Sequence, residues 1–380
     1  MVPIAAQVHD FPRFDRGDWE APMKVSDATV LAETLQLGKL AEPLGFDTIW
    51  STEHFGTTYT MTPDALQNLA YWAGHTERID VGSAVVVLPW HHPIQLAHKI
   101  TNLDHLLEGR RYFLGIGRGV AKMEYDALGI DRNESRGRFK ESWDVLKLAL
   151  TQERLSYDGE FFKIPETSIR PRPLHDDMLD HTACAFTTPE SMELAANEGF
   201  SQFFVTGAPL EEMSVAVDQY NAIRARRGLD ADQPRVLMWM YCSNDERQID
   251  RAGEWFAVHG AEASSHYGFT RPGEFDGVKG YEGYAAAVEK GLKEEAEGTR
   301  AQGNAMVRPE SQPIGTPEEI IRRLRLLQEQ TGAREVAVIP HFGGMTVKEA
   351  EDSVRLFAQE VMPAIQADPA PARVRDSVSA

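Results

Sequence analysis

The sequence contains little cysteine, no long apolar run and no basic start. Only two of its 380 residues are cysteines, Cys184 and Cys242, and both sit in apolar, strand-like stretches. Such cysteines are typical of small buried side chains, so we expect no disulfide framework and a reducing, cytoplasmic setting. No run of about 18 apolar residues is present and residues 1–10 carry no basic segment, so we expect neither a membrane span nor a signal peptide.

Positive charge is also scarce. The 39 Lys and Arg residues are outnumbered by 58 Asp and Glu residues, which gives a formal net charge of −19. A chain of this charge is repelled by phosphate backbones, so nucleic acid is not expected as a partner. An anionic ligand would need a local group of positive side chains, and single arginines close to glycines are the candidates.

What the sequence does contain is a regular alternation of strand-like and helix-like segments. This order predicts an α/β protein with a parallel sheet, and eight strands favour a (β/α)8 TIM barrel over an open doubly wound sheet. The expected strands are Ile4–Val8, Phe46–Trp50, Ile79–Leu88, Tyr112–Ile116, Thr182–Phe186, Gln202–Val205, Val236–Tyr241 and Arg334–Ile339. The expected helices are Asp27–Leu44, Pro63–Gly74, Pro93–Leu107, Glu134–Leu150, Pro189–Glu198, Leu210–Arg227 and Val347–Val361.

Two stretches break the alternation. Leu155–Ile164 is typical of a small hairpin around Asp158-Gly159, and an extended connector, Arg170-Pro-Arg-Pro173, follows it. Residues 262–308 form a long, polar, Gly-rich insertion before the eighth strand, with a helical piece at Glu289–Glu297. We expect one domain over residues 1–366 and a flexible tail over 367–380.

Histidines and a carboxylate follow the second and third strands, at the barrel end where catalytic residues lie. Glu53 and His54 could supply a general base, although a loop histidine bonded to backbone is an equally weighted alternative. His91 and His92 are adjacent and lack the further ligands that a metal ion requires. We therefore predict no metal, and expect His92 to contact a ligand or to cap the following helix.

Two further turns could hold an anion. Arg118 lies in Gly115–Gly119 after the fourth strand, where glycines let the backbone approach a ligand, and Arg136 opens the next helix. Thr187, Thr188 and Ser191 follow the fifth strand at a helix N-terminus, whose free N–H groups bind anions. Each feature also has an ordinary structural interpretation, as a common glycine turn, a solvated helix start or a threonine N-cap.

In combination these segments resemble the bacterial-luciferase-like flavin monooxygenases, in order and over nearly the whole chain. The motifs that carry the resemblance are Gly45–Trp50 with Glu53-His54, Val81–Ala84, Leu88-Pro89, His92-Pro93, Gly109–Gly119, Ser135-Arg136, Arg170–Pro173, Thr187–Ser191, Pro313–Glu318 and Phe357–Pro363. Gly117–Gly119, Ser135-Arg136 and the long insertion are most similar to the luciferase α subunit and to ketone-oxidising relatives.

The resemblance implies a dimeric TIM-barrel monooxygenase. Reduced FMN, delivered by a separate flavin reductase, would react with O2 to a C4a-hydroperoxyflavin that oxygenates an aldehyde or ketone, under a water-excluding lid at 262–308. His54 matches the catalytic histidine, and Arg118, Arg136, Thr187, Thr188 and Ser191 match phosphate-binding positions. Ala84 and Val85 match a non-prolyl cis peptide against the flavin ring, and Glu53, His92 and Thr206 are expected at the substrate pocket.

Three departures from the family pattern bear on the substrate. Gly117 stands where the luciferase α subunit has a reactive cysteine, so light emission is not implied. Phe55 replaces a second histidine, and Thr206 replaces a tryptophan of the ring pocket. Two alternatives on the same fold stay open: an oxidoreductase dependent on the deazaflavin F420, and a non-catalytic partner subunit.

Overall fold

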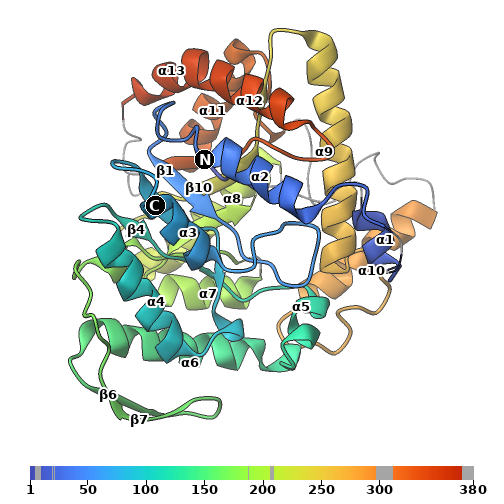
Figure 1. Cartoon of the computed structure of the whole chain (residues 1–380). Helices are drawn as coiled ribbons and strands as arrows, with labels where there is room; N and C mark the ends of the chain where they lie inside the picture. Colours follow the sequence, from blue (N-terminus) through green and yellow to red (C-terminus); the bar gives the residue numbers. More distant parts are fainter. Residues whose placement is uncertain are drawn as a thin grey trace, which may run out of the picture.

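Parallel strands form a ring in the computed structural model, which describes residues 1–4, 10–18, 20, 22–186, 188–205, 209–296 and 311–369 (Figure 1). The strands of the ring are β1 (Thr48–Ser51), β2 (Asp80–Ser83), β3 (Val86–Val87), β4 (Tyr112–Phe113), β5 (Gly115–Gly117), β8 (Ala183–Cys184), β9 (Ser201–Val205), β10 (Arg235–Trp239) and β13 (Glu335–Ile339). They pair in parallel in the orders β1-β2-β4 and β3-β5-β8-β9-β10-β13. The two sheets are continuous because β2 runs on into β3 and β4 into β5.

The N-terminal residues close the ring. The Val2 N–H donates to the Val338 carbonyl (2.8 Å), and the Trp50 N–H donates to the Met1 carbonyl (2.9 Å). Residues 1–2 therefore lie between β13 and β1, in the place of a first strand. This confirms the predicted (β/α)8 barrel, although the expected strand Ile4–Val8 lies outside the described residues beyond Ile4.

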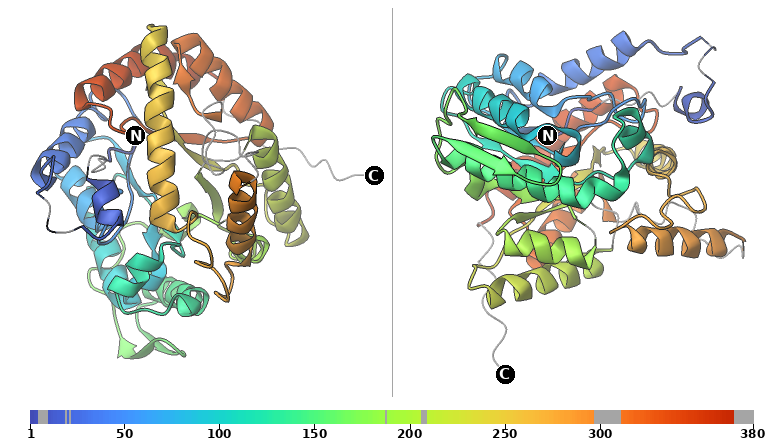
Figure 2. Two further views of the ribbon diagram at one scale, coloured as in Figure 1. Left: turned by 90° about the vertical axis from the view of Figure 1, so that its right-hand side faces the viewer. Right: turned by 90° about the horizontal axis from the view of Figure 1, so that it is seen from below.

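Helices surround the ring, most of them on its outside (Figures 1 and 2). They are α1 (Phe11–Asp15), α2 (Asp27–Gly38), α3 (Ala65–Ala73), α4 (Pro93–Leu106), α5 (Lys122–Ala127), α6 (Ser135–Thr151), α7 (Pro189–Asn197), α8 (Leu210–Arg226), α9 (Glu246–Tyr267), α10 (Glu282–Ala296), α11 (Pro317–Thr331), α12 (Val347–Leu356) and α13 (Met362–Gln366). A π-helical turn, Phe357–Val361, joins the last two. Among the described residues, no helix has the length and apolar content needed to cross a membrane.

Several predicted elements are confirmed with different bounds. The hairpin is β6 (Leu155–Asp158) with β7 (Lys163–Thr167), and Asp158 lies opposite Lys163. The helix expected to reach Leu44 ends at Gly38, because Pro43 has no N–H to donate and disfavours helical backbone in the residue before it. The long third strand is divided between β2 and β3 at a cis peptide bond, Ala84–Val85, at the position that the resemblance implied.

Helices α9 and α11 have no counterpart among the predicted elements. Helix α9 runs through Glu262 to Tyr267, so the irregular chain expected from residue 262 begins after Tyr267 instead. Helix α10 replaces the shorter helical piece expected at Glu289–Glu297, and residues 297–310 lie outside the described residues. Helix α11 begins with a capping box of Thr316 and Glu319, a sequence signal that could have located it.

Aromatic and paired charged side chains fill the ring at the amino ends of its strands. The buried Trp50 indole has the rings of Phe113 and Phe203 at 6.1 and 5.3 Å. Glu335, the first residue of β13, accepts from Trp50 Nε1 (3.1 Å) and from Nε of the buried Arg235 (2.9 Å). Because this end is filled, a reaction site can lie only at the carboxyl ends.

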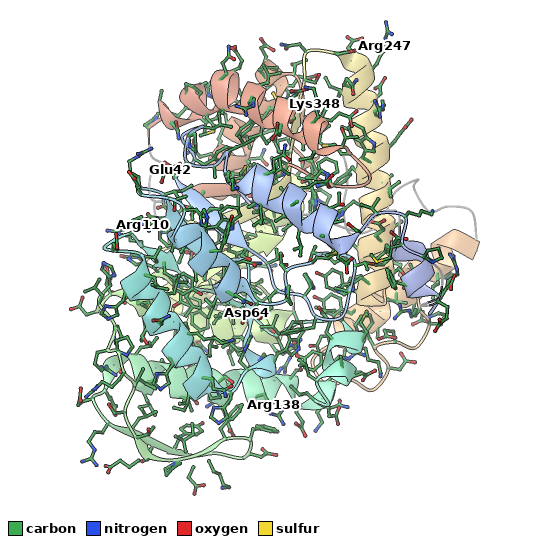
Figure 3. The ribbon with its side chains drawn as sticks, in the orientation of Figure 1. Glu42, Asp64, Arg110, Arg138, Arg247 and Lys348 are labelled. Carbon is green, nitrogen blue, oxygen red and sulfur yellow. The ribbon has the colours of Figure 1, made fainter. Side chains whose placement is uncertain are left out.

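Helix α9 lies across those carboxyl ends (Figure 2). Its first turn, marked by Arg247, is at the outer edge of the molecule (Figure 3), and its last turns reach the loops after β1 and β5. Helix α9 thus brings the side chains of a late segment to the candidate site.

Both cysteines are buried and free, as expected, and burial raises the pKa of each thiol to about 12.

A substitution at Gly115 would test how tightly the strand ends pack. A Cβ there would come well inside 3.0 Å of the Ser83 carbonyl oxygen, which is backbone and cannot rotate away. We expect Gly115→Ala to lower the unfolding free energy by about 1–3 kcal/mol in urea denaturation. Gly253→Ala on α9, where nothing lies within 4 Å, should instead be neutral or stabilising by up to about 1 kcal/mol. Equal effects would contradict this packing.

Candidate active site

A buried carboxylate, Glu124, joins two histidines at the carboxyl end of the ring. Helix α5 follows β5 and places Glu124 Oε1 3.0 Å from His54 Nδ1 and 2.9 Å from the Phe55 backbone N–H. Its other oxygen lies 3.6 Å from Nε2 of His266, in the last turn of α9. Three segments far apart in the sequence therefore meet at one carboxylate.

The charge of Glu124 fixes which proton His54 carries. Burial raises the pKa of Glu124, but the neighbouring His54 and His266 outweigh burial and lower it to about 2. The carboxylate is therefore ionised at neutral pH and can only accept, so His54 donates from Nδ1. This leaves His54 Nε2, 3.4 Å from the Tyr267 hydroxyl, as the nitrogen that can take up a proton from a reactant.

The same three side chains have the spacing of a metal site. The ligand atoms of His54, Glu124 and His266 all lie within 4.8 Å of one another. Our prediction of no metal considered only His91 and His92, and spacing in the sequence could not have shown this group. Because Oε1 already accepts from His54 and Phe55, we interpret the group as a hydrogen-bonded network, and the absence of a metal stays a prediction.

Further polar side chains of α9 line the same region. The Tyr59 ring stacks on His266 (4.8 Å) and on His259 (5.5 Å), and its edge faces His54 (5.4 Å). Burial lowers the pKa of His259 to about 4 and raises that of Glu262 to about 8. Both groups are therefore neutral at pH 7, as their burial requires.

Two arginines converge on one backbone position of the segment after α9. Arg118 Nη2 donates to the Gly280 carbonyl (2.6 Å), and the guanidinium lies 4.0 Å from the centre of the Tyr281 ring. A Cβ at Gly280 would come within 3.0 Å of both Arg118 Nη1 and Arg136 Nη2, so the two cations are neighbours. Those two nitrogens are buried without a hydrogen-bond partner in the described part of the chain. Paired, unsatisfied guanidinium groups are suited to a phosphate.

The N-terminus of α7 lies beside this pair. Thr188 is its N-cap: the Thr188 hydroxyl accepts from the Ser191 N–H (3.3 Å) and lies 3.0 Å from the Ser191 hydroxyl. Glu190 in the same turn is 4.0 Å from Arg136 Nη2, which ties α7 to the arginines. The structure therefore brings together Arg118, Arg136, Thr188 and Ser191, while Thr187 lies outside the described residues.

The other predicted site residues that the structure describes are Ala84 and Val85, Glu53, and His92. The Ala84–Val85 peptide faces β5, where a Cβ on Gly117 would collide with the Val85 side chain. Glu53 is buried, with one oxygen 2.8 Å from His91 Nε2 and the other accepting from the Val87 N–H (2.7 Å). His92 is exposed at the start of α4, with its ring edge against Phe162 (5.7 Å).

The contacts of Glu53 and His92 indicate structural roles, so their place in a substrate pocket stays a prediction. Thr206 lies outside the described residues. Sequence reasoning missed Glu124, His266, Tyr267 and Gly280. The spacing of His259, Glu262 and His266 along one helical face was an available signal, whereas nothing in the sequence distinguishes Glu124 from the other acidic residues.

A family model connects this geometry with known proteins. The model described as luciferase-like monooxygenase matches residues 18–335. The chain belongs to this family. Among relatives, the alkanal monooxygenase alpha chain of Photorhabdus laumondii is 26% identical over 355 residues, covering 90% of this chain and 94% of that protein. The limonene 1,2-monooxygenase of Rhodococcus erythropolis is 27% identical over 370 residues, covering 95% and 89%.

Solved structures of luciferase-like monooxygenases share the fold. Monooxygenase RslO1 from Streptomyces bottropensis aligns with a TM-score of 0.72 at 23% identity, over 91% of this chain and 96% of that one. The oxygenating constituent of 3,6-diketocamphane monooxygenase from Pseudomonas putida, solved in complex with FMN, aligns with a TM-score of 0.68 at 19% identity, over 90% and 94%. At these identities the likeness establishes the fold, and residue roles must come from the site itself.

Glu262 makes stability depend on pH. Because its pKa is raised from 4.5 to about 8, the native state holds a proton in this window that the unfolded chain has released, and stability falls as the pH rises. We expect Glu262→Gln to remove a slope of at most about 1.4 kcal/mol per pH unit. In thermal melts, its advantage over wild type should grow from pH 5 to pH 8. Glu254→Gln, at an exposed position of α9, should show no such trend; an unchanged slope in Glu262→Gln would contradict the assignment.

Proposed function

We propose that this chain is a monooxygenase that uses reduced FMN and O2 to oxygenate an aldehyde, a ketone or a similar small organic molecule. The names of its relatives support an oxygenation, and the arginine pair supports a phosphate-bearing cofactor. The observation that carries the proposal is the pair of neighbouring guanidinium nitrogens, Arg118 Nη1 and Arg136 Nη2, which have no hydrogen-bond partner among the described residues of a protein of net charge −19. A separate flavin reductase and a homodimer are predictions that accompany it.

The residues fit the phosphate of FMN. A dianionic phosphate would satisfy both guanidinium groups, and the Thr188 and Ser191 hydroxyls at the α7 N-terminus could add hydrogen bonds to it. Arg118 Nη1 and Arg136 Nη2 are buried atoms without a hydrogen-bond partner among the described residues, and the phosphate would supply one. The flavin ring would be held at Ala84–Val85, beside Gly117, whose missing side chain leaves room for Val85.

The chain's own residues position groups and move protons, while reduced flavin would supply the activation of O2. Glu124 accepts from His54 Nδ1 and so orients the ring, which leaves His54 Nε2 able to accept a proton and return it. The Tyr267 hydroxyl beside Nε2 can relay it. Phe275, Tyr281 and Val288, in the segment after α9, form a buried apolar cluster, and the Tyr281 ring lies 4.0 Å from the Arg118 guanidinium, so this segment would limit the access of water to that side of the site.

An F420-dependent oxidoreductase and a partner subunit remain the competing functions. The deciding experiment mixes the protein with reduced FMN and O2, in the presence of a panel of ketones and aldehydes, and measures oxygenated product by mass spectrometry. Oxygenated product supports the monooxygenase. Reduction of F420 by an alcohol, with no product from FMN, would instead establish hydride transfer.

Removal of one arginine should weaken flavin binding. We expect Arg118→Ala to raise the Kd for FMN by about 10- to 150-fold, equivalent to roughly 1.5–3 kcal/mol for a charged hydrogen bond. The measurement is a titration followed by flavin fluorescence. Arg138→Ala is the matched control, because Arg138 on α6 pairs with Glu134 at the outer surface (2.8 Å; Figure 3). Equal FMN affinity in Arg118→Ala and wild type would remove the phosphate role.

His54 and Glu124 should govern turnover without governing cofactor affinity. We expect His54→Ala to lower kcat by roughly 10²- to 10⁴-fold, the range of general acid–base catalysis. Glu124→Gln should lower kcat as well, because an amide can orient His54 but cannot stabilise its charge. FMN affinity should be unchanged in both, and His75→Ala, at an exposed position just after α3, should match wild type. Full turnover in His54→Ala would remove the catalytic role of His54.

A further inference from the structure

Four polar atoms at the buried face of α9 have no hydrogen-bond partner among the described residues. They are Nε1 of Trp239, Nδ1 and Nε2 of His259, and Oε2 of Glu262. The three residues are 4%, 1% and 5% exposed, so water cannot satisfy these atoms from the surface. Such groups destabilise a fold, and their accumulation in one place requires an explanation.

The three side chains lie together. The rings of Trp239 and His259 are 5.0 Å apart, and Glu262 follows His259 by one helical turn on the same face of α9. The Tyr59 ring stacks on His259 at 5.5 Å, and burial, with a smaller contribution from the nearby Glu262, raises the pKa of Tyr59. One local region, formed by the end of β10, the loop after β1 and α9, therefore holds all four atoms.

This region adjoins the proton site. One turn further along α9, His266 and Tyr267 contact Glu124 and His54, and the edge of the Tyr59 ring faces the His54 ring at 5.4 Å. The unpaired groups therefore lie one to two helical turns along α9 from the proton site. Toward the other end of α9, Trp255, Phe256 and Ala252 are apolar and belong to a hydrophobic core cluster.

The hydrogen-bonding capacity of these side chains is suited to a carbonyl or hydroxyl oxygen of a ligand. The Trp239 indole can only donate, and Glu262, which burial keeps protonated at neutral pH, can donate as well; His259 can donate from one nitrogen and accept at the other. A carbonyl accepts from such donors, and a hydroxyl can also give its proton to His259. An unsubstituted alkyl chain can do neither, and would leave all four atoms unpaired.

We propose that Trp239, His259 and Glu262 form a subsite that binds a second oxygen of the substrate, a hydroxyl or carbonyl remote from the reacting carbon. The substrate class is then an oxygen-bearing ketone or aldehyde and not a plain hydrocarbon chain. This inference rests on the proposed function, because it takes His54 as the reaction centre.

The test compares two ketones that differ by one hydroxyl, 2-tetralone and 6-hydroxy-2-tetralone. Titration calorimetry with the full chain, in the presence of oxidised FMN, measures the Kd of each. In wild type we expect the hydroxyl to tighten binding about tenfold or more. In Trp239→Phe, His259→Phe and Glu262→Met the ratio of the two Kd values should fall toward one, with the Kd of 2-tetralone unchanged.

The melting temperatures of the variants distinguish a binding role of these side chains from a structural role. Glu262→Met replaces an unpaired polar group by an apolar one of similar size, so its melting temperature should equal or exceed that of wild type while the hydroxyl preference is lost. Glu254→Met at an exposed position of α9 is the matched control and should retain the preference. A ratio near one in wild type, undetectable binding of the hydroxylated ketone, or a preference that survives in all three variants would overturn the proposal.

Binding of FMN distinguishes failure of the proposed function from failure of the subsite. If FMN does not bind to wild type but the hydroxyl preference appears and is lost in the variants, the subsite stands and the cofactor assignment fails. If FMN binds and the preference is absent, only the subsite fails.

Discussion

The interaction on which the site depends is the one between the Glu124 carboxylate and its three neighbours. A buried carboxylate is stable only when hydrogen bonds and opposite charge offset its lost hydration. Here His54 and the Phe55 backbone supply hydrogen bonds from the loop after β1, and His266 of α9 lies 3.6 Å away. Because one carboxylate contacts all three, it links the position of α9 over the ring to the orientation of His54.

The barrel explains why such distant residues can meet. In a ring of parallel strands every carboxyl end faces the same side, so the loops after β1, β5 and β8 become neighbours whatever their separation in sequence. The filled interior at the amino ends, with Trp50 and the Arg235–Glu335 pair, leaves that side as the place for chemistry. The cation pair and the histidine network then occupy adjacent parts of one rim.

The sequence allowed the barrel and the cation pair to be predicted, because both depend on local patterns. Strand periodicity indicates the ring, and an arginine between glycines after a strand indicates a turn that can approach an anion. Glu124 could not be predicted, since its role arises from two histidines 70 and 142 positions away in the sequence. Likewise Glu53, which looked like a pocket residue beside His54, points to His91 and the Val87 backbone, and only tertiary packing decides which way it faces.

Gly280 has a consequence for how this protein can vary. With φ at +78° it adopts a backbone conformation that favours glycine, and even a methyl group there would touch both guanidinium groups. Substitution at this one residue, which lies outside the barrel strands, would therefore push apart two cations anchored on other elements. Homologues that retain both arginines should be confined to glycine at this position, and those adapted to an anion of another size should have changed all three residues together.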